Sequence, residues 1–331
     1  MTAANLPSLL QRFFTDRLRS QLGASPHTIA SYRDTFRLLL VFASERLERS
    51  PSELRVEDLG VTLLVAFLEH LEHGRANTPK TRNTRLAALH SFFRFIAFAE
   101  PACSLQCQQV LAIPTKRHAR PPVEFLAEEE TVALVAAPDP ATWIGRRDRT
   151  LLLVAVQTGL RNAEIRSLRR HDVDLGVGAH VRCTGKGRKT RCTPLRRDVA
   201  AALDTWLAEQ GAGPGDPVFP SARGASLSAD ALEAIVTRHV SAASATCPSL
   251  VGRSITPHTL RHTAAMDLLR RGVDLTVIAL WLGHESIETT QIYLHADMRL
   301  KERALGHADP SGTPPARFRP SDSLLAFLAG L

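Results

Sequence analysis

Residues 179–195 read AHVRCTGKGRKTRCTPL, the one stretch of this 331-residue chain with a clear β pattern. Two short runs containing Val and Thr flank a glycine-rich turn at residues 185–187, which is typical of a β-hairpin. The segments on both sides of this hairpin carry helical patterns instead. The sequence therefore predicts a mainly α fold with a small β-hairpin or sheet, in the α+β class.

Residues 5–115 are expected to be almost entirely helical. The segment 25–47 has Ser25 as a candidate N-cap, Pro26 at the first helical position, and apolar residues near a period of 3.6. Residues 55–73 and 78–100 are predicted as two further amphipathic helices, the second capped by Thr78. These segments together predict a small helical bundle.

A proline-rich basic stretch, IPTKRHARPPVEFL at residues 113–126, follows the bundle. Its prolines interrupt any continuous helix, and residues 116–120 add three cations in five positions. We expect four parts: a helical domain over residues 1–112, a linker over 113–123, a second domain over 124–308, and a tail over 309–331. In the second domain, helices are expected at 146–159, from 161, and at 196–210, 228–244, 256–272 and 275–284.

Composition points to an intracellular protein with an anionic partner. The formal net charge is +8, and a basic balance is typical of proteins that bind nucleic acid. No apolar run approaches the roughly 20 residues needed to cross a bilayer, and the N-terminus lacks a signal-peptide core. Five cysteines in such a chain are expected to be reduced. The Cys103–Cys107 pair is interpreted as packing or loop thiols, because no second ligand pair follows it.

The stretch TPHTLRH, residues 256–262, predicts a helix N-terminus that could bind an anion. Thr256 is the expected N-cap and Pro257 the first helical residue, which places His258 and Arg261 on one face. A helix N-terminus itself favours a phosphate group. His258 and His262 also stand four residues apart, but a zinc motif of this spacing requires Glu where Thr259 stands.

Two further motifs supply cations. In TGLRNAEI, Arg161 follows a turn after a nearly apolar helix, with Asn162 as the expected cap, so its guanidinium requires an anion or a carboxylate such as Glu164. In TGKGRKT, Lys186 stands between two glycines at the hairpin tip. A nucleotide-binding P-loop is excluded there, because Gly187 stands where Ser or Thr should follow the lysine.

The last motif, WLGHESIETTQIYLHAD at residues 281–297, places Tyr293 nine residues after His284. Tyr293 is one of only two tyrosines, against 13 phenylalanines. The motifs together supply arginines, imidazoles, a lysine and a phenol. Paired arginines can hold a phosphodiester and stabilise its developing charge without a metal. A tyrosine activated by neighbouring cations can attack phosphorus, and the covalent link conserves the energy of the broken bond.

In type, order and spacing, the strings TGLRNAEI, TGKGRKTR, TPHTLRH and LGHESIETTQIYLH resemble the signature motifs of the tyrosine recombinase (phage integrase) family. The resemblance is strong over residues 120–305 and weaker over residues 5–112. It implies a helical, SAM-like core DNA-binding domain followed by a tyrosine-recombinase catalytic domain. It also implies a site-specific DNA recombinase that needs neither metal nor other cofactor nor ATP.

The resemblance implies a role for each motif residue. Tyr293 would attack the scissile phosphate and form a 3′-phosphotyrosyl link, while Arg161 and Arg261 hold the phosphate. Lys186 would protonate the leaving 5′-oxygen, and Glu164 would occupy the family's acidic supporting position. The two imidazoles expected to assist proton transfer and phosphate binding are His258 and His284.

The expected partner is double-stranded DNA with paired recombination sites. Polar residues of the helical domain and linker are the candidate contacts: Thr28, Arg33, Lys80, Arg82, Asn83, Arg85, Lys116, Arg117 and Arg120. The resemblance further implies a tetramer on DNA, with related recombinases as possible co-partners and no membrane association. Residues 321–331, SDSLLAFLAGL, could dock on a neighbouring protomer or in cis. The expected location is the cytoplasm, at the nucleoid.

Three alternatives remain open at this point: a non-catalytic DNA-binding protein on the same fold, a type IB-like topoisomerase, and a metal-dependent nuclease. Integration, transposition and resolution would all use the same residues.

Overall fold

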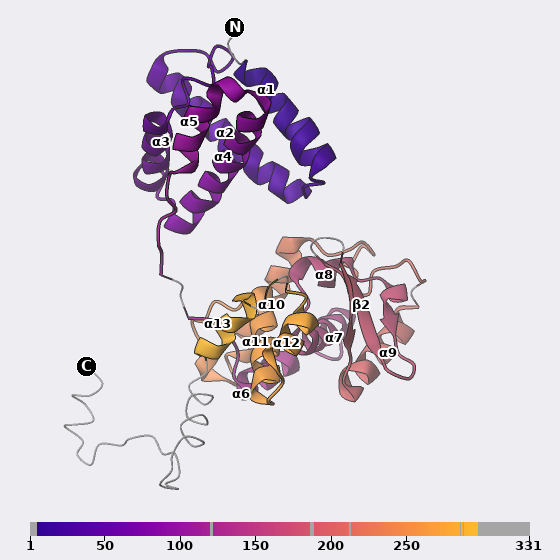
Figure 1. Ribbon diagram of the computed structural model, residues 1–331. Coiled ribbons are helices and arrows are strands. Elements are labelled where there is room, and N and C mark those ends of the chain that lie inside the picture. Colours follow the sequence, from indigo (N-terminus) through magenta and orange to yellow (C-terminus); the bar gives the residue numbers. More distant parts are fainter. Residues whose placement is uncertain are drawn as a thin grey trace, which may run out of the picture. The chain divides into compact units, whose positions relative to one another are not determined.

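The computed structural model describes residues 5–119, 122–185, 189–211, 213–284, 286 and 288–296. The chain divides into two compact units, Met1–Arg120 and Pro121–Leu331 (Figure 1). The expected boundaries at residues 112, 123 and 308 stay predictions, and the tail after residue 308 lies outside the described residues. No described helix is long and apolar enough to span a bilayer.

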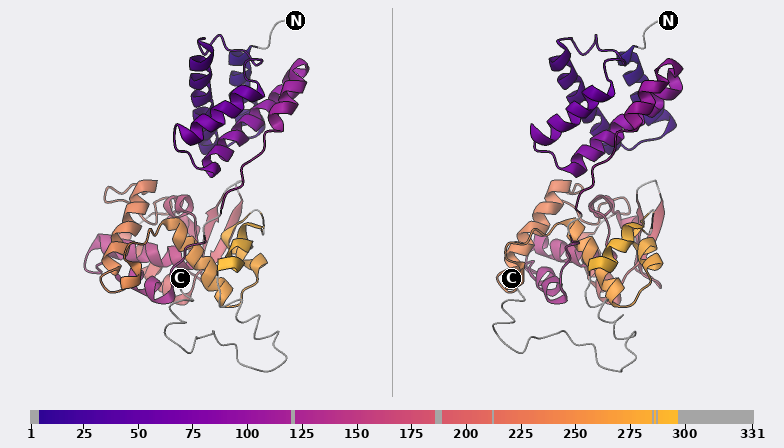
Figure 2. Two further views of the ribbon diagram at one scale, coloured as in Figure 1. Left: turned by 90° about the vertical axis from the view of Figure 1, so that its left-hand side faces the viewer. Right: turned by 60° about the vertical axis from the view of Figure 1, so that its left-hand side comes forward.

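The described part of the first unit is built from helices, as both views of Figure 2 show. In chain order they are α1 (Leu6–Arg12), the π-helical η1 (Phe13–Gln21), α2 (Pro26–Leu47), α3 (Val61–His73), α4 (Pro79–Ala99), the short 3₁₀ helix η2 (Pro101–Cys103) and α5 (Ser104–Leu111). The predicted helical bundle is thereby confirmed.

The predicted caps of α2 and α4 are confirmed. The Ser25 hydroxyl accepts the Thr28 N–H at 3.2 Å, and the Thr78 hydroxyl accepts the Thr81 N–H at 3.3 Å. The helix predicted from residue 55 begins only at Val61. Its expected first turn is replaced by a tight turn, in which the Asp58 carboxylate accepts the Arg55 N–H at 2.9 Å.

Aromatic rings fill the core of this unit. Phe13 makes edge-on contacts with Phe36 and Phe92, at centroid distances of 6.1 and 5.2 Å. Cys103 and Cys107 are buried in the same core, where they pack as small apolar side chains, in line with the packing role inferred from the sequence.

The second unit combines helices with one small sheet (Figure 1). Its helices are α6 (Glu128–Ala136), α7 (Trp143–Thr158), α8 (Asn162–Ser167), η3 (Arg170–Asp172), α9 (Arg197–Gln210), α10 (Ala229–Ala243), η5 (Pro248–Leu250), α11 (Pro257–Arg270), α12 (Leu275–Leu282) and α13 (Glu288–Ala296). Its strands are β1 (Val173–Asp174), β2 (His180–Thr184) and β3 (Thr190–Pro194). The predicted class, mainly α with a small β-sheet, is confirmed.

The predicted hairpin forms the centre of the sheet. Strands β2 and β3 pair antiparallel with Cys183 opposite Arg191, and β1 adds a short third strand beside β2. The hairpin tip, residues 186–188, lies outside the described residues.

Helix α7 supports the segments that carry the predicted site motifs. It packs against α9 and α11 and ends at Gly159 in the left-handed region, at φ 64°, as the sequence predicted. A Cβ at Gly159 would lie 2.7 Å from the Leu282 side chain of α12, so glycine is required there twice over. The turn after Gly159 then delivers Arg161 to the start of α8.

The expected cap of α8 is corrected by one residue. Arg161, not Asn162, has the non-helical N-cap backbone. Its side chain offers no acceptor to the helix start, and the Glu164 carboxylate instead reaches back to accept the Arg161 N–H at 2.8 Å.

Candidate active site

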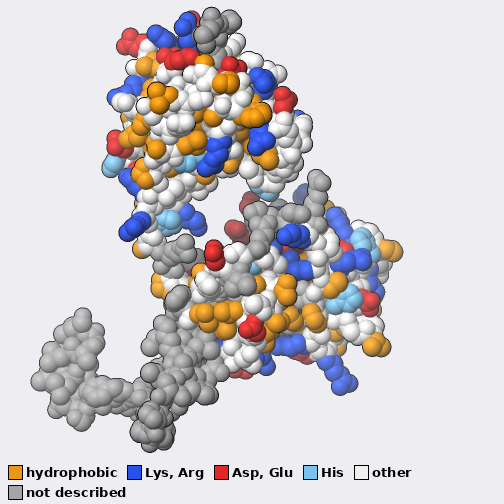
Figure 3. Space-filling model, viewed as in Figure 1, with side chains coloured by type: hydrophobic (Ala, Val, Ile, Leu, Met, Phe, Trp, Pro, Cys, Tyr) orange, Lys and Arg blue, Asp and Glu red, His pale blue; other side chains and the backbone are white. Residues whose placement is uncertain are grey.

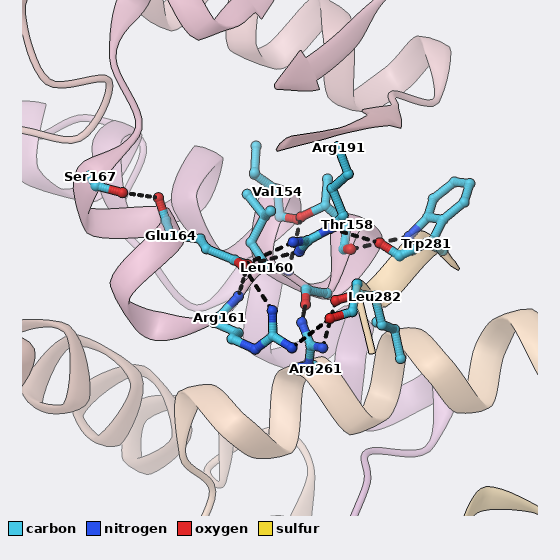
Figure 4. Close-up of polar contacts among 12 residues, drawn as sticks. Val154, Thr158, Leu160, Arg161, Glu164, Ser167, Arg191, Arg261, Trp281 and Leu282 are labelled. Atoms are coloured by element: carbon cyan, nitrogen blue, oxygen red, sulfur yellow. Dashed lines mark hydrogen bonds and ion pairs between the residues drawn. The ribbon is translucent and has the colours of Figure 1, made fainter. Parts of the chain in front are cut away.

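Three arginines from separate elements converge on the C-terminal end of α12 (Figure 4). Each guanidinium donates a hydrogen bond to one of three consecutive carbonyls. The pairs are Arg191 Nε to Trp281 O at 3.0 Å, Arg261 Nη2 to Leu282 O at 2.7 Å, and Arg161 Nη2 to Gly283 O at 2.8 Å.

This convergence has an electrostatic cause. The last carbonyls of a helix have no partner within it and carry the negative end of its dipole, so they favour cations. Gly283 ends α12 with φ 64°, and a Cβ there would lie 2.8 Å from Arg191 Nη1. The glycine therefore leaves the space in which the Arg191 guanidinium reaches the helix end.

The carboxylate of Glu164 joins two of these arginines. Its Oε1 accepts from Arg161 Nη1 at 3.0 Å and from Arg191 Nη1 at 2.9 Å, while Oε2 accepts from Arg191 Nη2 at 2.8 Å. Burial favours the protonated acid, but the hydrogen bonds from Arg191 and from the Arg161 N–H outweigh it and lower the pKa of Glu164 to about 2. Glu164 is thus ionised and orients both cations.

Arg191 is a site residue that the sequence reasoning missed. A signal for it existed in the hairpin register: Arg191 lies opposite Cys183, and cross-strand partners share one face of a sheet. Val181 and Cys183 mark the buried face of β2. An arginine opposite Cys183 therefore requires a carboxylate partner in the interior.

The two arginines predicted to hold a phosphate differ in exposure. Arg261 is 2% exposed and also donates from Nη1 to Gly159 O at 2.7 Å, whereas the Arg161 side chain is 34% exposed. Burial and then the charge of Arg161 lower the pKa of Arg261 to about 10. The positive charges of the two guanidiniums therefore act on each other. Arg161 is the one more accessible to a ligand.

Tyr293 is buried, with 1% of its surface exposed. Its ring packs in a small core with Met266 of α11 and Leu282 of α12, and its hydroxyl is hydrogen-bonded to His262 Nδ1 at 2.9 Å. Burial raises the pKa of Tyr293 to about 12, against the opposing effect of the Arg261 charge. The phenol ring is therefore packed in a core, and its oxygen is hydrogen-bonded.

The histidines divide into two environments. The His258 side chain is exposed, and its ring lies 4.3 Å from the ring of His262 between centroids. His284 Nδ1 is hydrogen-bonded to the Thr290 hydroxyl at 2.8 Å. Burial, followed by the charges of Arg261 and its neighbouring cations, lowers the pKa of His284 to about 4. For His262, burial and then the charges of His258 and Arg261 lower the pKa to about 4.

Lys186 lies outside the described residues, and its role stays a prediction. The residue before it does report on the hairpin's course: a Cβ on Gly185 would lie 2.9 Å from Glu164 Oε1. The hairpin therefore runs against the arginine–glutamate cluster just before the lysine. Among the side chains that the structure describes, no group of three or more His, Cys, Asp or Glu gathers as a metal site would require.

The candidate DNA contacts of the first unit fall into two groups. Arg33, Lys80, Lys116 and Arg117 are exposed, and Thr28 and Arg85 are partly so, whereas Arg120 lies outside the described residues. On the face drawn in Figure 3, Lys and Arg side chains are dispersed among acidic and hydrophobic ones. These contacts stay predictions.

Arg82 and Asn83 have structural partners in the linker. Arg82 is 5% exposed and donates from Nη1 to Pro114 O at 2.9 Å. Asn83 donates to Lys116 O at 2.8 Å and accepts the Lys116 N–H at 3.0 Å. Lys116 Nζ in turn pairs with Glu72 at 2.6 Å. The first linker residues are therefore fastened to α4, and Arg82 offers little surface to DNA.

Comparison with known proteins identifies the family of this chain. Residues 124–299 match the model of the phage integrase family, and residues 10–99 match the N-terminal SAM-like domain of phage integrases. A curated relative in Sinorhizobium fredii, the putative integrase/recombinase y4rC, is 54% identical over 328 residues. The aligned residues cover 99% of this chain and 99% of the relative.

A second curated relative is the tyrosine recombinase XerD of Pseudomonas aeruginosa. It is 32% identical over 312 residues, which cover 90% of this chain and 96% of the relative. The crystal structure of the XerH site-specific recombinase bound to palindromic difH substrate matches the fold with a TM-score of 0.69, at 24% identity over 86% of this chain and 80% of that one.

The chain therefore belongs to the phage integrase family, the class of tyrosine-type site-specific DNA recombinases. Its nearly full-length similarity to y4rC extends through both units.

Proposed function

We propose that this protein cuts and rejoins DNA at specific sites through a covalent 3′-phosphotyrosyl intermediate on Tyr293, without metal or ATP. The observation that carries the proposal is the location of the Tyr293 hydroxyl. It is hydrogen-bonded to His262 Nδ1 at 2.9 Å, and the charge of Arg261 acts on the phenol.

The arrangement supports phosphoryl transfer to a tyrosine. Arg161 and Arg261 would hold the nonbridging oxygens of the scissile phosphate, where negative charge grows as attack proceeds. Glu164 keeps Arg161 oriented through a hydrogen bond of 3.0 Å. In the same reaction Lys186 would protonate the departing 5′-oxygen, and His258 and His284 would assist.

The arginines currently donate to main-chain carbonyls, which stand in for phosphate oxygens as hydrogen-bond acceptors. Arg161 is the better placed to exchange its carbonyl for a phosphate, because about a third of its side chain is exposed. Arg261 is nearly fully buried, so besides holding the phosphate it would preserve the geometry and the positive field.

The partner in this proposal is duplex DNA with paired sites, bound by a homo-oligomer that reaches a tetramer during strand exchange. XerH was crystallised on a palindromic substrate, and a palindrome offers two equivalent half-sites to a pair of protomers. The basic net charge of +8 favours such a polyanionic partner.

Trapping on a nicked suicide duplex carrying the recombination site tests the proposal. The nick releases a short oligonucleotide after cleavage, so that the covalent adduct cannot be resealed. We expect a protein–DNA adduct in EDTA without ATP, and its loss in Tyr293→Phe with DNA binding retained. A Tyr293→Phe variant that still forms the adduct would refute the proposal, and cleavage that requires a metal would indicate a nuclease. Resealing of a single site without exchange between two sites would indicate a topoisomerase.

A further inference from the structure

The phenol of Tyr293 has a specific hydrogen-bond partner that none of the motif assignments uses. His262 Nδ1 lies 2.9 Å from the Tyr293 oxygen, and the two rings meet at 67° with centroids 5.5 Å apart. The rings come from α11 and α13, separated by 31 residues of sequence. This contact therefore depends on the tertiary fold.

We propose that His262 is the general base that accepts the Tyr293 proton during strand cleavage. The inference rests on the proposed function, since it assigns the proton that the nucleophile must lose. A base has to lie within hydrogen-bonding reach of that proton, and the 2.9 Å contact satisfies this geometric condition.

The step balances in atoms and charge. As the bond from Tyr293 Oη to phosphorus forms, the phenolic proton passes to Nδ1 of His262, and the neutral imidazole becomes an imidazolium. The bond from phosphorus to the 5′-oxygen breaks, and that oxygen leaves with a proton from the general acid, for which Lys186 is the candidate. Religation reverses both transfers.

The surroundings of His262 keep its imidazole in the form that can accept a proton. The charged and titratable groups around it are His258 and Arg261 on α11, His284 beyond α12 and Tyr293 on α13. Burial and the charges of His258 and Arg261 lower the pKa of His262 to about 4, so the ring is neutral at pH 7.

Substrate binding would increase the basicity of this imidazole. A phosphate held by the arginine cluster offsets the positive charge of Arg261, and a smaller positive field raises the pKa of His262. The base would therefore become more effective when DNA occupies the site, which couples proton transfer to the presence of substrate.

A pair of substitutions separates the base from a positioning role. In His262→Asn, the amide oxygen can stand near the place of Nδ1 and accept the same hydrogen bond, but it takes up no proton. We expect both His262→Asn and His262→Ala to slow adduct formation on the suicide duplex by about 10²–10⁴-fold, the usual range for general-base catalysis. His171→Asn, at an exposed histidine of the same unit, is the matched control and should leave the rate unchanged.

A sulfur-substituted substrate separates the base from the acid. A bridging sulfur in place of the scissile 5′-oxygen leaves without needing a proton. It should rescue Lys186→Ala and leave His262→Ala and His262→Asn slow. Because the chain has only two tyrosines, fluorotyrosine can be placed solely at position 293 in a Tyr32→Phe background. Its more acidic phenol should partly restore His262→Ala.

Several outcomes would overturn the assignment. A rate for His262→Asn within about threefold of the parent protein would show that a hydrogen-bond acceptor suffices. Rescue of His262→Ala by the sulfur substrate would make His262 an acid, and faster cleavage by His262→Ala would make it a lock on the phenol. In each case the adduct would still require Tyr293, so the proposed function would stand. An adduct that forms in Tyr293→Phe would instead refute the proposed function itself.

Discussion

Individual side chains in this site have pKa values that differ from those of the same groups in water. Glu164 stays ionised with a pKa near 2, while the pKa values of His262 and His284 fall to about 4. Burial is the largest cause for both histidines, and the charges of neighbouring cations add to it, whereas for Glu164 the hydrogen bonds from Arg191 and from the Arg161 N–H outweigh burial. For Tyr293, burial outweighs the Arg261 charge and raises the pKa to about 12.

These shifts predict a pH dependence of stability. For a histidine whose folded pKa is lowered, the unfolded chain binds more protons, so stability is complete above pH 6.5 and is lost as the pH falls toward 4. We expect the free energy of unfolding of the second unit, measured by denaturant titration, to fall over this range.

The comparison variant for this titration is His262→Asn, which has no imidazole to protonate. Its stability should change less between pH 6.5 and 4 than that of the parent protein. Parallel pH curves for the two proteins would contradict the lowered pKa of His262.

At the scale of the elements, the end of α12 organises the site. The carbonyls of its last two residues and of the following Gly283 accept hydrogen bonds from Arg191, Arg261 and Arg161, respectively. A strand, a helix and a helix start are thereby tied to one helix terminus. Arg191 is the central tie, because it also makes two hydrogen bonds to Glu164.

Removing that tie should destabilise the second unit. Arg191→Ala leaves Glu164 short of a buried partner, and breaking such a pair costs about 3–5 kcal/mol. The loss should appear in denaturant unfolding. Arg182→Ala, at an exposed arginine of the neighbouring strand, should change stability by no more than about 0.5 kcal/mol. Equal effects of the two substitutions would show that Arg191 is not a structural tie.

The start of the linker is the second element with a defined anchor. Asn83 holds the main chain of Lys116 by two hydrogen bonds, each worth about 1 kcal/mol. Asn83→Ala should therefore increase the rate of tryptic cleavage after Lys116 and Arg117 by roughly tenfold. Mass spectrometry of the fragments measures this rate. Thr84→Ala, at an exposed site of the same helix, is the control; if it matched Asn83→Ala, the anchor would be disproved.

In the whole molecule, local sequence patterns predicted elements of both units. Helices α2, α4 and α11 were predicted with their caps, because Ser25, Thr78 and Thr256 act on residues three positions away. Local patterns also located the hairpin and the turn at Gly159. The late start of α3 was missed, because the turn at Arg55–Asp58 depends on one carboxylate.

Site contacts that depend on tertiary structure escaped the sequence. The motif order brought out Arg161, Arg261, His284 and Tyr293, but local spacing cannot pair His262 with a phenol 31 residues away. Arg82 was a plausible DNA contact on the polar side of a helix. Its hydrogen bond to Pro114, 32 residues on, makes it a support of the linker.

Binding to DNA is a property of the whole molecule and should depend strongly on salt. Each protein–phosphate contact contributes about 0.9 to the slope of log affinity against log salt concentration. Lys80→Ala removes an exposed cation from the start of α4 and should lower the slope by about one in binding titrations. Arg146→Ala should leave it unchanged, since Arg146 is already paired with Glu209. An unchanged slope for Lys80→Ala would remove Lys80 from the interface.

The most direct test of the account is to identify the residue that carries DNA. The trapped adduct would be digested with protease and nuclease, and the nucleotide-bearing peptide sequenced by mass spectrometry. We predict a single modified peptide, with the 3′-phosphate of a nucleotide esterified to Tyr293. A nucleotide on any other residue, or a link through a 5′-phosphate, would contradict the central claim.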